Sequence, residues 1–82
     1  MIQSELINRL MSILKELIAV PDEGALPYQT FQELNINSLV FVQLVVRCEQ
    51  EFNIEFEDDR MLMEKYPTME AFLNFVTDKA MV

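Results

Sequence analysis

Apolar residues recur three and four positions apart along the first part of the chain, and this spacing constrains the fold more than any other feature. Residues so spaced fall on one face of an α-helix, so the pattern predicts an amphipathic helix from Ile2 to about Ile18. Its buried stripe comprises Leu6, Leu10, Ile13, Leu14 and Leu17. Because such a stripe must be covered by another element, the pattern predicts a packed helical domain.

A second helix is predicted from Ser38 to Phe52. Asn37 is expected to be its N-cap, because an Asn side chain accepts hydrogen bonds from the free N–H groups of a first turn. One side is expected to be apolar and buried: Phe41, Val42, Val45, Cys48 and Phe52. The opposite side is expected to face solvent and is neutral to basic: Val40, Gln43, Arg47 and Gln50.

The segment from Val20 to Asn37 is expected to be a long irregular loop. Pro21, Gly24 and Pro27 interrupt the helical pattern there. Four apolar side chains are expected to pin this loop to the core: Tyr28, Phe31, Leu34 and Ile36. Ordered loops of this length are uncommon in small domains and often carry function.

The last third of the chain is predicted to form one short and one longer helix. After the acidic segment from Glu55 to Asp59, residues 60–63 leave room for only a short helix before Tyr66 and Pro67. Thr68 is expected to cap a final helix. The apolar side of that helix is Phe72, Leu73, Phe75 and Val76. The predicted fold is therefore all-α: a four-helix bundle with a long loop between helices one and two and a short third helix.

Composition and charge limit the classes of partner. With 82 residues, of which 51% are hydrophobic, residues 1–82 are expected to form a single domain. Six Lys and Arg against fourteen Asp and Glu give a net charge of -8, and the basic residues are scattered. Nucleic acid and anionic membranes need a cationic surface and are poor partners. Partners with basic patches are favoured, although the acidity also has the simpler interpretation of keeping the domain soluble.

The single cysteine and the chain start indicate a cytoplasmic protein. Cys48 has no second cysteine with which to form an internal disulfide. The start lacks the basic residues and apolar stretch of a signal peptide, and no apolar run approaches the roughly 20 residues of a membrane span. Beginning at Met1 and ending just past the last predicted helix, the sequence is expected to be free-standing.

Intrinsic catalysis is disfavoured by the residues that the chain lacks. Without histidine it lacks the commonest general base, and one glycine cannot build a Gly-rich phosphate loop. The acidic residues from Glu55 to Asp59 do not fit a calcium loop, because the residues after Asp59 are not oxygen ligands. Cys48 is expected to be a buried apolar residue. Met61, Met63 and Met69 either fill the core or line an adaptable pocket.

The stretch Phe31-Gln-Glu-Leu34-Asn-Ile-Asn-Ser38-Leu39 has a more specific pattern. It resembles the acyl and peptidyl carrier proteins, whose modified serine lies in a Phe-x-x-Leu-Gly-x-Asp-Ser-Leu setting at the start of the second helix. The Glu-x-x-Phe and Ile-x-hydrophobic spacings that follow also match, at Glu49, Phe52, Ile54 and Phe56. The resemblance covers nearly the whole chain and implies an all-α bundle of acyl-carrier type.

The resemblance implies that the protein is a carrier and not an enzyme. Ser38 would bear a covalent 4'-phosphopantetheine arm, with Asn37 and Leu39 beside it, and the arm would hold an acyl, aminoacyl or peptidyl group as a thioester. Independently, the start of a helix favours an anion, because free N–H groups and the positive end of the dipole lie there. The simpler interpretation is that Asn37 and Ser38 only cap the helix.

Two residues depart from the family pattern. Asn35 stands where the family usually has Gly, and is tolerable because Asn enters the left-handed region more readily than most residues. Asn37 stands where the family usually has Asp, which keeps the capping oxygen and loses a charge. The family's transferases use a magnesium ion near that aspartate, so an unmodified carrier-like protein stays an open alternative.

The family docks its partners through the second helix, and the matching exposed positions are Val40, Gln43, Val46 and Arg47. None is acidic, which favours docking through apolar and polar contacts, and a discrete monomeric carrier of a specialised polyketide, nonribosomal peptide or fatty-acid-like pathway. The implied partners are a phosphopantetheinyl transferase and the loading and condensing enzymes. The alternative is a helical adaptor without an arm that binds a partner through Val40, Phe41, Gln43 and Arg47.

Overall fold

Three α-helices form the framework of the computed structural model, which describes residues 3–20, 22 and 24–80. They are α1 (Gln3–Leu17), α2 (Ser38–Phe52) and α3 (Met69–Ala80). Three single 3-10 turns lie between them: η1 (Leu26–Tyr28), η2 (Asp58–Arg60) and η3 (Met63–Lys65). The described residues contain no strand, and the all-α prediction is confirmed. Ile2, where the first helix was predicted to begin, and Pro21, one of the residues predicted to interrupt the helical pattern, lie outside the described residues.

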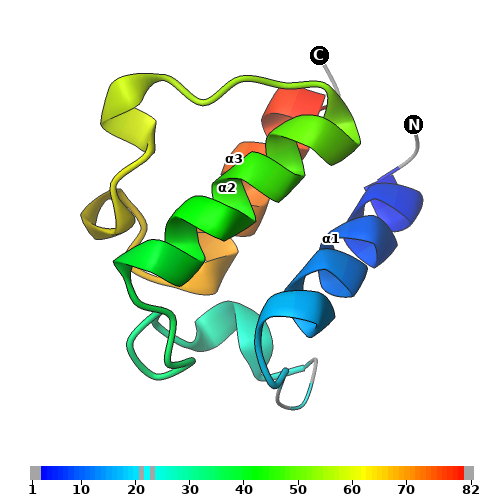
Figure 1. Cartoon of the computed structure of the whole chain (residues 1–82). Coiled ribbons are helices and arrows are strands. Elements are labelled where there is room, and N and C mark those ends of the chain that lie inside the picture. Colours follow the sequence, from blue (N-terminus) through cyan, green and yellow to red (C-terminus); the bar gives the residue numbers. More distant parts are fainter. Residues whose placement is uncertain (1–2, 21, 23, 81–82) are drawn as a thin grey trace.

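The helices pack around one core, and the two connections run along its edges (Figure 1). Helix α1 packs against both α2 and α3. Leu6, Leu10, Ile13 and Leu14 of α1 are each at most 2% exposed, as their spacing predicts. The predicted second helix matches the bounds of α2. Its first residue, Ser38, stands where the long first connection ends.

An aromatic cluster fills the space between α2, α3 and the connections. The ring centroids of Phe31 and Phe41 are 5.3 Å apart, as are those of Tyr66 and Phe72. Phe56 stacks on Phe72 at 5.9 Å. Phe72, which touches all of these rings, is 0% exposed. The cluster therefore ties α3 to the start of α2 and to both connections.

The loop after α1 is pinned by four buried residues, of which three were predicted: Leu26, Phe31, Leu34 and Ile36. The prediction for Tyr28 is wrong, because its side chain is 73% exposed. In η1, Leu26 takes the inward position, and with about three residues per 3-10 turn Tyr28 points elsewhere. The loop is also joined to α3, since the N–H of Met69 donates to the carbonyl of Gln29 at 2.8 Å.

Helix α2 buries a slightly different face from the predicted one. Phe41, Val45 and Cys48 are buried as expected, together with Leu44. The prediction for Val42 is wrong, because this side chain is 44% exposed. One residue along a helix is a rotation of about 100°, so a residue directly after the buried Phe41 turns towards the flank.

The segment between α2 and α3 has two single 3-10 turns where a short third helix was predicted, so the count of four helices is approximate. Leu62 separates the turns with an extended backbone. The hydroxyl of Tyr66 donates to the carbonyl of Arg60 at 2.7 Å and fixes the end of the segment. The extended backbone of Leu62 divides the segment into two turns, so no continuous helix is formed there.

Two ion pairs join α1 to α2 on the surface. The guanidinium of Arg9 donates to Glu51 at 3.2 Å, and that of Arg47 donates to Glu16. All four side chains are more than a third exposed, so each pair adds at most about 1 kcal/mol to stability. They join the middle and the end of α1 to α2.

Candidate functional site

The chain before Ser38 is shaped by reciprocal hydrogen bonds. The N–H of Thr30 donates to Glu33 Oε1 at 2.8 Å, and the N–H of Glu33 donates to Thr30 Oγ1 at 3.0 Å. Asn35 then adopts a left-handed backbone with φ of 60°. The family's glycine is thus replaced by a residue type that tolerates this conformation, as the sequence predicts.

Asn37 caps α2 as predicted. Its side-chain Oδ1 accepts from the N–H of Val40 at 2.9 Å, and its carbonyl accepts from the N–H of Phe41 at the same distance. The extended backbone of Asn37 turns the chain from the loop into the helix. Buried Ile36, 3% exposed, anchors this corner to the core.

Ser38 presents its side chain to solvent at the first position of α2. Within the described part of the chain, no hydrogen bond holds its hydroxyl, and the N–H groups of Ser38 and Leu39 have no partner. The hydroxyl is therefore accessible to an outside enzyme, and two backbone donors next to it are available to an anion.

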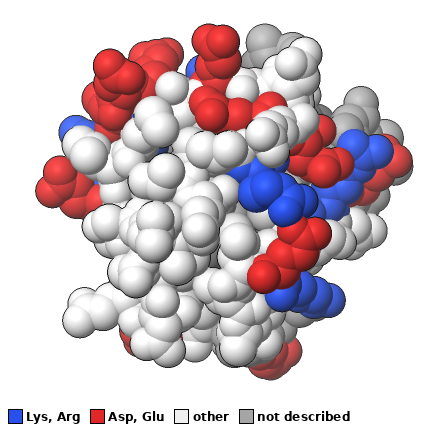
Figure 2. Space-filling model, viewed as in Figure 1, with Lys and Arg blue, Asp and Glu red and all other residues white. Residues whose placement is uncertain are grey.

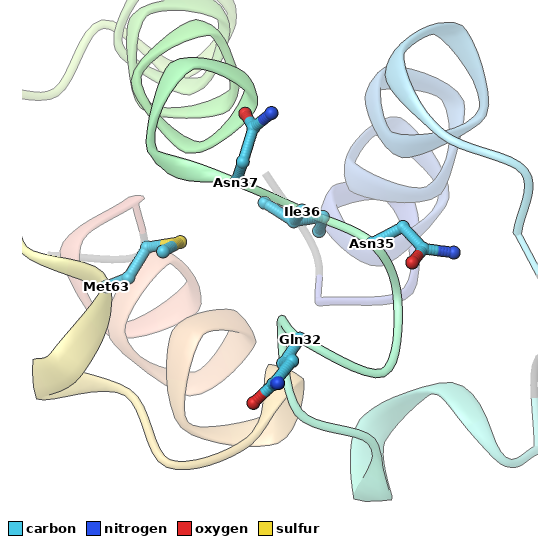
Figure 3. A pocket seen from close by; sticks show the side chains of 5 residues that line it. All are labelled: Gln32, Asn35, Ile36, Asn37 and Met63. Carbon is cyan, nitrogen blue, oxygen red and sulfur yellow. The ribbon is translucent and has the colours of Figure 1, made fainter.

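A pocket of about 460 Å³ lies beside this corner (Figure 3). It is lined by Gln32, Asn35, Ile36, Asn37 and Met63. Met63 reaches towards the corner from the segment that precedes α3, on the other side of the pocket from Gln32 and Asn37. The lining offers carboxamide groups and two apolar side chains and carries no charge, so it suits a neutral ligand with amide groups.

The exposed side of α2 is mostly apolar. Leu39, Val42 and Val46 are 67%, 44% and 39% exposed. Gln43 is exposed, and Arg47 is half-buried in its pair with Glu16. Figure 2 shows uncharged side chains over the start of α2 and the loop before it, with Asp and Glu gathered around η2 and along α1. On the face in view, the carboxylates therefore lie away from the start of α2.

One predicted partner contact is wrong. Phe41 is 1% exposed and packs against Phe31 and Tyr66, so a partner cannot touch it directly. Val40 is half-buried and packs against the core, which leaves part of its side chain at the surface. The partner surface predicted from the sequence did not include Val42, which is exposed. Its rotation around α2 relative to the buried Phe41 was a signal that could have placed it at the surface.

The thiol, carboxylate and methionine side chains considered below are buried or take part in contacts within the fold. Burial raises the pKa of the Cys48 thiol to about 12, so the prediction of a buried, unreactive thiol is confirmed. Glu49 Oε2 accepts from the N–H of Phe56 at 2.9 Å. Met69 is fully buried, and Met61 and Met63 pack at the edge of the core. No group of three or more potential metal ligands occurs among the described residues.

Comparison with known proteins agrees with this geometry. Residues 8–76 match the family described as "Phosphopantetheine attachment site". An acyl carrier protein of Thermosynechococcus vestitus is 34% identical over 78 residues, which cover 94% of each chain. The chain belongs to the acyl carrier protein family.

Two further acyl carrier proteins show the same relationship. That of Cylindrotheca sp. is 31% identical over 93% of this chain and 94% of its own length. That of Thermobifida fusca is 27% identical over 90% of this chain and 92% of its own. No solved structure gives a significant match. None of the helices in the described part of the chain has the length and apolar character of a membrane span.

As an acyl carrier protein the chain is a non-enzymatic carrier, and its prosthetic group is 4'-phosphopantetheine. The corner at Ser38 fits this group. A phosphodiester there would meet the unpartnered N–H groups at the start of α2, and the neighbouring pocket offers neutral amides to the amide-containing arm. The group supplies the reactive thiol, and the protein positions it.

The cap of α2 predicts a stability effect that is independent of the prosthetic group. Asn37→Ala removes the acceptor for the N–H of Val40 and should cost about 1 kcal/mol, which lowers the melting temperature by about 4–8 °C in a domain of this size. Asn37→Asp retains the acceptor and should melt within about 2 °C of the wild type. Thermal denaturation followed by circular dichroism measures both. Equal melting of the two variants would show that the cap contributes nothing.

Proposed function

We propose that the protein is a discrete acyl, aminoacyl or peptidyl carrier that holds biosynthetic intermediates as thioesters on a phosphopantetheine arm attached to Ser38. The observation that supports this most strongly is the exposed hydroxyl at the first position of α2, which no other described residue engages. A phosphopantetheinyl transferase would move the arm from coenzyme A onto that oxygen. The same oxygen buried in the fold would not allow such a transfer.

The residues beside Ser38 would hold the phosphodiester. The N–H groups of Ser38 and Leu39 and the positive end of the α2 dipole favour its negative charge. Asn37 is already used as the cap through Oδ1, so it fixes the first turn and adds no negative charge next to the phosphate. The arm would then leave this corner towards the neutral pocket or towards a docked enzyme.

The pathway is proposed from the surface of α2. Carrier proteins in general interact with a transferase and with acyl-handling enzymes. Here the positions proposed to meet them are Val40, Gln43, Val46 and Arg47. Because these residues are not acidic, we assign the protein to a specialised polyketide, nonribosomal peptide or fatty-acid-like pathway, with loading and condensing enzymes that dock through apolar and polar contacts.

The proposed working form is a monomeric single domain that spans residues 1–82 and acts in the cytoplasm. The described helices share one hydrophobic core, which supports a single domain. A net charge of -8 opposes association between copies of the chain, which supports a monomer.

A second candidate function is a carrier-like adaptor that never receives an arm. Asn37 in the place of the usual Asp favours it, as does the apolar exposed row on α2. Such an adaptor would gain no mass with a transferase, and its partner binding would survive Ser38→Ala and be lost when Val42 is changed to Asp.

The thiol content of the native protein tests the carrier proposal. Cys48 is the single cysteine and is 0% exposed, so the native unmodified protein should react very slowly with a colorimetric thiol reagent at pH 8. Its pKa of about 12 leaves almost no thiolate at that pH. After incubation with coenzyme A and a broad-specificity transferase, and removal of the remaining coenzyme A and the transferase, the protein should carry one fast-reacting thiol per chain, that of the arm.

The control is the unmodified protein in denaturant, which should also show one reactive thiol, that of Cys48. Absence of a fast thiol after incubation, together with an unchanged intact mass, would exclude the carrier proposal and favour the adaptor. A fast thiol in the native unmodified protein would contradict the burial of Cys48.

A further inference from the structure

The interior behind the start of α2 is filled by aromatic rings. Phe41 follows Ser38 by three residues on α2 and is 1% exposed. Its ring centroid lies 5.3 Å from that of Phe31 and 5.9 Å from those of Tyr66 and Phe72. Rings at such separations are in direct contact. The four rings therefore occupy the space between α2, α3 and the two connections.

A saturated chain cannot pass between these rings unless they move apart. Non-bonded carbon atoms need about 3.5–4.0 Å between them, so a methylene chain inserted between two touching rings has to widen their separation by about that amount. Tyr66 opposes such a movement, because it is 4% exposed and its hydroxyl donates to the carbonyl of Arg60 at 2.7 Å. The loop is tied to α3 as well, by the 2.8 Å hydrogen bond from the N–H of Met69 to the carbonyl of Gln29. Opening the interior would leave these groups without partners.

The pocket of about 460 Å³ beside the start of α2 is unsuited to a long alkyl chain. Gln32, Asn35 and Asn37 line it with exposed carboxamide side chains, and Ile36 and Met63 are its two apolar residues (Figure 3). An alkyl chain laid over the carboxamides would remove their water without supplying hydrogen bonds in its place. An aminoacyl group, or a short acyl group with hydroxyl or carbonyl oxygens, would supply them.

A second pocket, of about 340 Å³, lies where the end of α1 meets the exposed side of α2. It is lined by Leu17, Val42, Gln43, Val46 and Arg47. Val42 and Val46 are 44% and 39% exposed, so an alkyl chain in this pocket would still lie partly in water. The chain would also reduce the solvation of the ion pair between Arg47 and Glu16. This pocket therefore shelters a short apolar group better than a long chain.

We propose that the group carried on the arm is a short acyl or aminoacyl group that stays outside the helices, and that the aromatic rings around Phe41 prevent the burial of a long saturated chain. Burial in the interior would favour a long chain most, because each methylene group gains free energy by leaving water. With the interior closed, a long chain stays in water at the end of the arm. The inference rests on the proposed function, because it requires an arm on Ser38, and it disfavours a fatty-acid-like pathway.

Thermal melting of the protein loaded with two different acyl groups tests the proposal. A broad-specificity transferase that accepts acyl-coenzyme A would load an acetyl or a decanoyl arm onto the wild type, and the intact mass would identify each product. Because the decanoyl chain finds no room in the core, the two forms should melt within about 2 °C of each other. Cleavage of the thioesters by hydroxylamine is a second measurement. The ratio of the decanoyl rate to the acetyl rate should equal that of the free coenzyme A thioesters.

Phe41→Ala removes the ring that closes the interior. An apolar cavity left by truncation binds apolar ligands, so the decanoyl form of this variant should melt above its acetyl form, by at least about 4 °C. Phe41→Leu opens a smaller space and takes its place if Phe41→Ala does not fold. Phe52→Ala is the matched control, because it truncates a half-buried ring at the other end of α2. Its two acylated forms should melt together.

The outcomes separate this inference from the proposed function. A decanoyl form of the wild type that melts well above the acetyl form, or whose thioester is protected from hydroxylamine, overturns the inference and leaves the carrier function standing. Equal melting of the two forms of the folded Phe41 variant overturns it too, because the ring would then not be what excludes the chain. No mass gain of the wild type with coenzyme A or with either thioester overturns both.

Discussion

Phe72→Ala should remove a large part of the stability of the fold. Phe72 is 0% exposed and contacts the rings of Phe31, Phe41, Phe56 and Tyr66. Truncation of a buried Phe costs about 3–5 kcal/mol, because the transfer free energy is lost and a cavity is left. An 82-residue domain has a total stability of about 4–12 kcal/mol, so the variant should lose about a quarter of that stability or more.

Urea denaturation followed by circular dichroism measures this effect. Tyr28→Ala is the matched control, because it also removes an aromatic ring but one that is 73% exposed. Its free energy of unfolding should change by no more than about 0.5 kcal/mol. If the two variants had the same midpoint, the aromatic cluster would not be the centre of the core.

Ser38→Ala should abolish modification and leave the fold intact. The variant lacks the hydroxyl that accepts the arm, so its intact mass should not change on incubation with coenzyme A and transferase. Its melting temperature should stay within about 2 °C of the wild type, because Ser38 is exposed and the cap is made by Asn37. A mass gain equal to that of the wild type would place the arm on another residue.

Local patterns predict much of this fold because they depend on neighbours in sequence. The stripe on α1 follows from the spacing of Leu6, Leu10 and Ile13 alone, since helical geometry brings such residues onto one face. The cap at Asn37 and the left-handed Asn35 likewise depend on the intrinsic properties of one side chain and its own turn.

The predictions from the sequence are wrong where packing between distant segments decides which side chains are buried and how the backbone runs. Whether Tyr28 or Leu26 turns inward depends on how η1 meets α3, which the sequence of the loop does not contain. Two separate 3-10 turns stand where a short helix was predicted, because the backbone of Leu62 between them is extended. Helical spacing placed Val42 with Val45 on the buried side, although its rotation relative to Phe41 turns it outward.

One part of the candidate site could also be predicted from the sequence, and another part could not. The position of Ser38 at the start of α2 follows from its own segment and from the resemblance to carriers. The pocket between α1 and α2 does not, because it requires Leu17 to meet Val46 and Glu16 to pair with Arg47, 31 residues away. Contacts of this kind become visible only once the helices are placed in space.

Peptide mapping by mass spectrometry after treatment with coenzyme A and a broad-specificity transferase tests the central claim most directly. Trypsin cleaves after Lys and Arg, so the three serines, Ser4, Ser12 and Ser38, fall in different peptides. We expect one phosphopantetheinyl group on the peptide of residues 16–47, and fragmentation that assigns it to Ser38. A group on Ser4 or Ser12, or no modified peptide at all, would contradict the account.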